Sequence, residues 1–174
     1  MEDEKEIVVN IDLEELLVRA GKGNNEDIEL LRKLCKEPYD AIKFSRIIEA
    51  SKSGNEVART MLWEEVGADE LVQTHKLQWA LDWCREEGFE CCSDMDDLIE
   101  FCLTSEEIGL DIGDSLFDYD IYLEDSIISI CISHLCCKTS KRLLETYIET
   151  IEDFEWLHNL IAQGNEWSLD YLAE

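Results

Sequence analysis

The sequence of 174 residues is poor in proline, in glycine and above all in basic side chains. It has 1 Pro and 8 Gly, too few for the many tight turns of a β-sandwich or a β-barrel, so a helical fold is favoured. Its 15 Lys and Arg stand against 42 Asp and Glu, for a formal net charge of -27. Because direct binding to nucleic acid or to anionic lipid needs positive charge, this balance argues against both as partners.

Long apolar runs are also missing. The longest, residues 127–137, is shorter than the 18 or more residues of a membrane span, and Ser129, Ser133 and His134 interrupt it. The first six residues carry four acids and lack the cationic and apolar regions of a secretory signal. We therefore expect no contact with a membrane and a location in the cytoplasm of the host cell.

Apolar side chains, in contrast, are plentiful. They make up 45% of the sequence and include 5 Trp, 5 Tyr and 5 Phe, enough to build a core and too many for a disordered acidic tail. The 8 Cys are expected to be thiols, since neither the length nor the N-terminus suggests a small secreted disulfide scaffold. In each adjacent pair, Cys91 with Cys92 and Cys136 with Cys137, at least one thiol is expected at the surface.

Apolar residues recur at helical spacing along most of the chain and predict an all-α fold. We expect a compact bundle or a short helical-repeat-like array of about seven helices, preceded by a short strand or an extended arm at residues 6–11. One long helix is predicted at residues 70–87 and another at 141–163, with an irregular loop containing one helical turn at 104–118. Residues 121–137 fit a helix or a strand, and we favour the helix. The predicted lobes are residues 1–67 and 68–174, which could also form one domain.

A Gly–Asn pair follows a helix at three places, ending at Asn24, Asn55 and Asn165. The first two lie 31 residues apart, near the period of two-helix repeats such as ankyrin or tetratricopeptide units, but no repeat signature fills the interval. Because Gly and Asn readily adopt the left-handed conformation that ends helices, ordinary helix termination explains the pairs as well.

The charge is unevenly distributed. Residues 88–174 carry a net charge of -18, against -9 for residues 1–87, and no basic residue occurs between Arg85 and Lys138. Plain solubility or salt adaptation could give such an excess, but solvated helices usually alternate Lys with Glu, and salt adaptation fits poorly with the many large apolar residues. A docking surface for a basic partner explains it best. The predicted contact acids are Glu86, Glu87, Glu90, Asp94, Asp96, Asp97, Glu100, Glu106, Glu107, Asp111, Asp114, Asp118, Asp120, Glu124 and Asp125, followed by Glu145, Glu149, Glu152 and Asp153. The predicted aromatic anchors beside them are Phe89, Phe117, Tyr119, Tyr122 and Trp156, since aromatic side chains concentrate interface energy.

Sequence signals for chemistry are weak. Cys131, His134, Cys136 and Cys137 are close in sequence but lack the paired spacing of zinc sites, and the acids at 111–120 lack the spacing of a calcium loop, so we expect no metal and no cofactor. None of the three His lies near a nucleophile motif, and no phosphate-binding glycine loop is present. The sequence therefore predicts a protein that is not an enzyme.

In charge, size and lack of catalytic motifs, the chain resembles the acidic nucleic-acid mimics that phages and mobile elements encode, the class that includes antirestriction and anti-CRISPR proteins. The resemblance is compositional, covers mainly residues 86–174 and assigns no role to any residue. It implies a stoichiometric inhibitor that occupies the basic channel of a nuclease or of a CRISPR-type nucleoprotein complex. Two other interpretations remain. One is an immunity or adaptor protein that covers an exosite of a basic toxin, and the other is a helical-repeat scaffold in which the Gly–Asn turns line a concave peptide groove.

Overall fold

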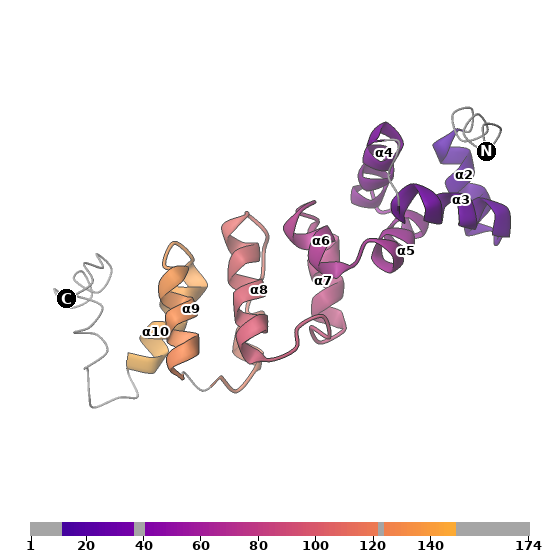
Figure 1. The fold of residues 1–174 in the computed structure, drawn as a ribbon. Coiled ribbons are helices and arrows are strands. Elements are labelled where there is room, and N and C mark those ends of the chain that lie inside the picture. The colour runs from indigo at the N-terminus through magenta and orange to yellow at the C-terminus, as the bar shows by residue number, and fades with distance from the viewer. Residues whose placement is uncertain (1–11, 37–40, 122–123, 149–174) are drawn as a thin grey trace. The chain divides into compact units, whose positions relative to one another are not determined.

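The computed structural model describes residues 12–36, 41–121 and 124–148. Throughout these ranges the fold is all-α, with nine α-helices, one 3-10 helix and no strand, which confirms the predicted fold class (Figure 1). The predicted strand at residues 6–11 and the predicted helices beyond residue 148 lie outside the described ranges. None of the described helices combines the length and the apolarity needed to cross a bilayer.

The chain divides into two compact units, Met1–Cys91 and Cys92–Glu174. The division therefore falls after α7 and not at the predicted boundary between residues 67 and 68. In the first unit, α5 packs on α6 and α6 on α7, so no break in packing occurs at Gly67. Its helices are α2 (Leu13–Gly21), α3 (Asn25–Lys36), α4 (Ala41–Lys52), α5 (Glu56–Glu65), α6 (Ala68–Gln73) and α7 (Gln78–Glu86).

Helices of the first unit bury one apolar face each. Leu31, Ile47 and Leu62 are completely buried on three different helices, and α2, α3, α4 and α5 all pack on one another. Arginine side chains reinforce this packing: Arg19 pairs with Asp27 across α2 and α3, and Arg32 pairs with Glu65 across α3 and α5. Two arginines of this unit thus hold its own helices together.

The predicted helix at 70–87 is wrong in one respect, because the structure breaks it into α6 and α7. Lys76 adopts a positive φ of 54°, and the Leu77 amide donates to the Leu71 carbonyl at 3.1 Å. Leu71 and Leu77 are both buried, so the turn brings two core residues together that a continuous helix would hold apart. Asp69 lies in the first turn of α6 and does not cap a helix, since Gly67 holds the N-cap position.

The two Gly–Asn turns of the first unit have the same hydrogen bonds. Asn24 donates its amide to the Arg19 carbonyl, and Asn55 donates to the Ala50 carbonyl. In both turns the preceding Gly has a positive φ, and the Asn side chain then accepts backbone N–H groups of the next helix. The turn therefore ends one helix and caps the next, and it joins the pairs α2–α3 and α4–α5 in equivalent ways. The third Gly–Asn pair lies outside the described ranges.

Removing either cap should weaken the first unit by a similar amount. We expect Asn24→Ala and Asn55→Ala each to lower the free energy of unfolding by about 1 kcal/mol, the usual value of an N-cap side chain. Urea unfolding followed by circular dichroism measures the change. Asn24→Asp keeps an acceptor oxygen and should retain most of the stability. If the Asp variant were as unstable as the Ala variant, the cap would not be the cause.

The second unit contains α8 (Met95–Glu107), η1 (Ser115–Asp118), α9 (Asp125–Ser133) and α10 (Lys138–Ile148). Helix α8 extends further than predicted: Thr104 lies inside it, and the single helical turn expected at 104–118 is η1. The helix chosen for residues 121–137 is confirmed over 125–133, after which residues 134–137 form a turn. The predicted helix at 141–163 is described only as far as Ile148.

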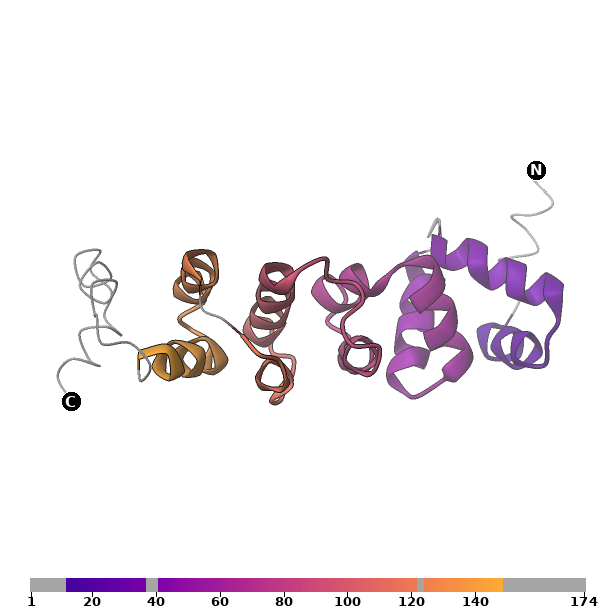
Figure 2. The same cartoon turned by 90° about the horizontal axis from the view of Figure 1, so that it is seen from below.

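Helices α8 and α9 run in the same direction, side by side. Ser126 at the start of α9 donates to Asp96 at the start of α8, and His134 after α9 bonds to Glu107 at the end of α8. Both views show α9 beside α8 and α10 beside α9 (Figure 1, Figure 2). Ile99, Leu103, Cys131 and Leu144 are completely buried among these helices. The parallel course brings the acidic first turns of α8 and α9 to the same end of the unit.

Candidate functional site

The predicted contact acids are distributed over both units. Glu86, Glu87 and Glu90 are exposed at and after the end of α7, in the first unit. The exposed acids of the second unit are Asp94, Asp97, Glu100, Glu107, Asp111, Asp114, Asp118, Asp120, Glu124 and Glu145, and Asp96 and Glu106 are half-buried. The side chain of Asp125 and the residues Glu149, Glu152 and Asp153 lie outside the described part. We call the acids of residues 94–124 the acidic surface.

Several of these carboxylates hold the backbone as well. Asp94 is the N-cap of α8 and accepts the Asp97 amide at 2.8 Å. Asp111 accepts the Gly113 amide at 2.9 Å in the loop that follows α8. Asp96 and Asp97 lie in the first turn of α8, where the partial positive charge of the helix end stabilises carboxylates. These positions therefore have a local structural role that the charge count alone does not reveal.

One arginine of α10 neutralises part of the predicted site. Arg142 pairs with Asp114 at 2.8 Å, and its guanidinium carbon lies 3.8 Å from the centre of the Phe117 ring. The sequence interpretation treated the acids between Arg85 and Lys138 as unopposed, which is wrong for Asp114. Phe117 is half-buried beneath this cation, so its ring face is already covered on one side. Asp114 therefore shares its charge with Arg142, and Phe117 has one ring face fewer to offer a partner.

The remaining aromatic predictions have mixed outcomes. Phe89 is only 4% exposed, so its predicted role as an anchor is wrong. Its amide donates to the Cys84 carbonyl in the turn that ends α7, which turns the ring into the core. Tyr119 is half-buried and keeps an accessible part. Tyr122 and Trp156 lie outside the described residues.

A compact polar cluster occupies the end of α8. Oε1 of Glu107 lies 2.7 Å from Nδ1 of His134 and accepts a hydrogen bond from the thiol of Cys136 at 3.0 Å. Both hydrogen bonds lower the pKa of the Glu107 carboxyl, and the bond from Cys136 has the larger effect. The hydrogen bond between Cys136 and Glu107 also raises the pKa of the Cys136 thiol. Glu107 was predicted to contact a partner, but the structure engages it within its own unit.

Cys137 lies next to this cluster and differs from its neighbour. It is buried and donates its thiol to the Leu103 carbonyl at 3.3 Å, while Cys136 is exposed. Burial raises the pKa of Cys137 to about 12. All eight cysteines are free thiols, as expected, and each adjacent pair has one exposed member, Cys91 and Cys136.

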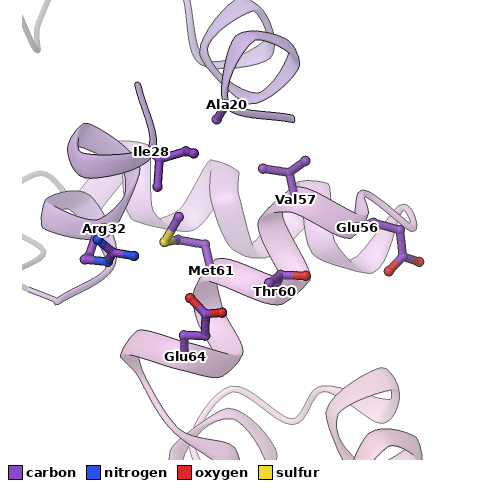
Figure 3. Close-up of a pocket in the computed structure, with 8 residues that line it drawn as sticks. All are labelled: Ala20, Ile28, Arg32, Glu56, Val57, Thr60, Met61 and Glu64. Carbon is purple, nitrogen blue, oxygen red and sulfur yellow. The ribbon is translucent and has the colours of Figure 1, made fainter. Parts of the chain in front are cut away.

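The first unit contains a groove of about 340 Å³ between α2, α3 and α5 (Figure 3). Apolar atoms of Ala20, Ile28, Val57 and Met61 line it, and Arg32, Glu56, Thr60 and Glu64 complete its wall. The scaffold interpretation placed a peptide groove at the Gly–Asn turns. The observed groove is formed by helix faces, and neither Asn24 nor Asn55 lines it.

No protein-family model, curated protein or solved structure matches this chain significantly.

Proposed function

We propose that the protein is a non-catalytic binding protein whose acidic surface docks on a basic, nucleic-acid-handling protein and inhibits it as a nucleic-acid mimic, in the manner of antirestriction and anti-CRISPR proteins. The observation that carries the proposal is the exposure of Glu100, Asp118, Asp120 and Glu124 on or between α8 and α9. A set of like charges costs folding stability through self-repulsion, so its retention at the surface favours a role in binding.

The difference between the two units supports this proposal. In the first unit, Arg19, Arg32, Arg59 and Arg85 pair with acids on their own or neighbouring helices. In the second unit, residues 92–148 contain only Lys138, Lys141 and Arg142 as strong bases, all within α10. The acids of α8, of the following loop and of the start of α9 thus present a negative field. Such a field steers a cationic partner into contact and raises its association rate.

Neutralising four acids of this surface tests the proposal. The variant Glu100→Gln, Asp118→Asn, Asp120→Asn, Glu124→Gln removes four charges from exposed residues and keeps the side-chain shapes. A control with the same change in net charge is Glu14→Gln, Glu26→Gln, Asp69→Asn, Glu70→Gln, all exposed in the first unit and outside the groove. Proteins captured from host lysate at low and high salt are identified, and their association rates with each form are measured.

At low salt we expect the acidic-surface variant to associate at least about tenfold more slowly with the captured basic protein, with a flatter salt dependence. The control should stay within about twofold of the natural protein. Equal rates and equal salt dependence for both variants would rule the proposal out. Added duplex nucleic acid or guide-bound target should displace a mimic, whereas an immunity or adaptor protein bound at an exosite would remain in place.

A helical-repeat interaction scaffold is the second candidate function. The matching hydrogen bonds of the Asn24 and Asn55 turns favour it, because repeated helix pairs commonly form extended binding surfaces. For a scaffold, substitutions in the groove at Val57 or Thr60 should impair partner binding more than the loss of charge at α8 does. Comparing Thr60→Arg with the acidic-surface variant and its first-unit control distinguishes a scaffold from a nucleic-acid mimic.

A further inference from the structure

Three metal-binding side chains converge at one place in the second unit, and His134 lies beside one of them. The carboxylate of Glu107 and the sulfur atoms of Cys136 and Cys137 all lie within 4.8 Å of one another. Nδ1 of His134 lies 2.7 Å from the same carboxylate oxygen of Glu107. Glu107 ends α8, and the other three residues form the turn between α9 and α10. The site therefore joins segments that are nearly thirty residues apart in the sequence.

The turn that carries three of these residues is held by hydrogen bonds independent of their side chains. The Ser140 hydroxyl is completely buried and bonds to the carbonyls of Cys131 at 2.8 Å and His134 at 2.9 Å. The Cys137 amide donates to the His134 carbonyl at 2.9 Å. Leu103, whose carbonyl accepts the Cys137 thiol, and Leu144 on α10 are completely buried. The backbone thus presents the donor atoms before any ligand binds.

We propose that Glu107, His134, Cys136 and Cys137 bind one zinc ion that joins the end of α8 to the turn between α9 and α10. Thiolate, imidazole and carboxylate are the ligands that zinc takes in proteins, commonly four of them in a tetrahedron. Thiolate sulfur is a poor ligand for calcium or magnesium, which prefer oxygen. This proposal differs from the sequence interpretation, which expected no metal because the cysteine spacing alone lacks a paired motif.

Two of the separations between these ligand atoms are close to those of a zinc site. With zinc–ligand bonds of about 2.0–2.3 Å, neighbouring ligand atoms of a tetrahedron lie about 3.3–3.8 Å apart. The observed separations of 2.7 Å for Glu107 and His134 and 3.0 Å for Glu107 and Cys136 need to widen by less than about 1 Å. Cys137 has to rotate its sulfur away from the Leu103 carbonyl. His134 lies outside the group of ligand atoms that are all within 4.8 Å of one another, so its ring has to turn toward the sulfur atoms.

The protons balance in a simple way. Each thiol gives its proton to solvent as its sulfur binds the cation, and neutral His134 presents Nδ1 with its proton on Nε2. Two thiolates and one carboxylate then carry three negative charges against two positive charges of zinc. Nearby acids, including Glu106 on the preceding residue, add a negative field that attracts a divalent cation.

Cobalt titration of the reduced protein tests the site, with cobalt as a spectroscopic substitute for zinc. We expect one Co²⁺ per chain, with the intense absorption of thiolate-to-cobalt charge transfer and the visible bands of a tetrahedral site. One equivalent of Zn²⁺ should remove both signals. Absence of the charge-transfer band in the natural protein would overturn the proposal and leave a hydrogen-bonded cluster only.

Variants locate the metal. Cys136→Ser and Glu107→Gln should each weaken cobalt binding at least about tenfold, the lower end of the loss seen even for groups that only orient a ligand. Both residues are exposed, so the fold should tolerate either change, and circular dichroism checks this. Cys91→Ser is the control, because this exposed thiol lies in the first unit, 3.9 Å from Cys84. Unchanged affinity in Cys136→Ser, or loss of the band in Cys91→Ser, would overturn the assignment.

Discussion

Replacing Trp79 with alanine is expected to lower the free energy of unfolding by about 3–5 kcal/mol, the usual cost of removing a buried tryptophan side chain. Trp79 on α7 is only 6% exposed and meets the Trp83 ring edge to face, with 5.0 Å between ring centres. Its indole N–H donates to the hydroxyl of Ser51 on α4 at 3.1 Å. The side chain therefore connects two helices of the first unit through both packing and a buried hydrogen bond.

The contacts of Ser51 explain why the loss should be large. The Ser51 hydroxyl donates to the Ile48 carbonyl, and the backbone carbonyl of Ser51 accepts a hydrogen bond from the Arg59 side chain at 2.8 Å. Arg59 also lies over the Trp79 ring, 5.5 Å from its centre. Alanine at position 79 would leave a cavity and remove one partner from Ser51 and one from Arg59.

Urea unfolding at constant m-value measures the effect of Trp79→Ala. Trp79→Phe is the matched variant, because it keeps an aromatic ring and loses the N–H donor. It should cost about 1–2 kcal/mol, close to the value of one buried hydrogen bond with some loss of contact area. A loss below about 1 kcal/mol for Trp79→Ala would show that the indole contributes little to the core.

Replacing Leu103 with alanine should destabilise the second unit by about 2–5 kcal/mol. Leu103 on α8 is completely buried, one helical turn before Glu107. Its carbonyl also accepts the Cys137 thiol, so the residue lies directly beneath the turn between α9 and α10. A cavity here removes apolar contacts from the packing that supports both the acidic surface and the cluster at Glu107.

Circular dichroism during urea unfolding measures the change in Leu103→Ala. The control is Glu100→Ala, on the exposed side of the same helix, which should stay within about 0.5 kcal/mol of the natural protein. If both substitutions had the same small effect, α8 would not depend on this apolar face.

Local sequence patterns predicted much of the fold. Leu13, Leu16, Leu17 and Ala20 recur at helical spacing, and all four are buried on α2 as that pattern requires. Leu98, Ile99 and Cys102 follow the same kind of spacing and are likewise buried on α8. These predictions succeed because burial of one helix face and Gly–Asn chain reversal depend on residues close in sequence.

The failures occur where tertiary contacts decide the outcome. The break at Lys76 places a lysine in a left-handed conformation, which is uncommon for residues other than Gly, so no local signal marks it. Phe89 was assigned to the surface because acids flank it, but the turn after α7 buries it.

The candidate site could be predicted only in part. Exposure of most acids follows from their charge, since carboxylates are rarely buried without a partner. The pairing of Arg142 with Asp114, and of Glu107 with His134 and Cys136, joins residues 27–29 positions apart. It depends on α8 and α9 running in parallel, and that arrangement is set by the loop between them and by the packing of α10. No motif in the sequence encodes it.

The equivalence of the Asn24 and Asn55 turns has a consequence for how the chain can change in length. Each turn reverses the chain, closes one helix and opens the next, using bonds that reach no further than five residues. The two Asn residues lie 31 positions apart. If the segment between them were duplicated or deleted, the new junction would keep the same turn hydrogen bonds. Variation by whole helix pairs is then the least disruptive route to a longer or shorter molecule, as in proteins whose stability is a sum over neighbouring modules.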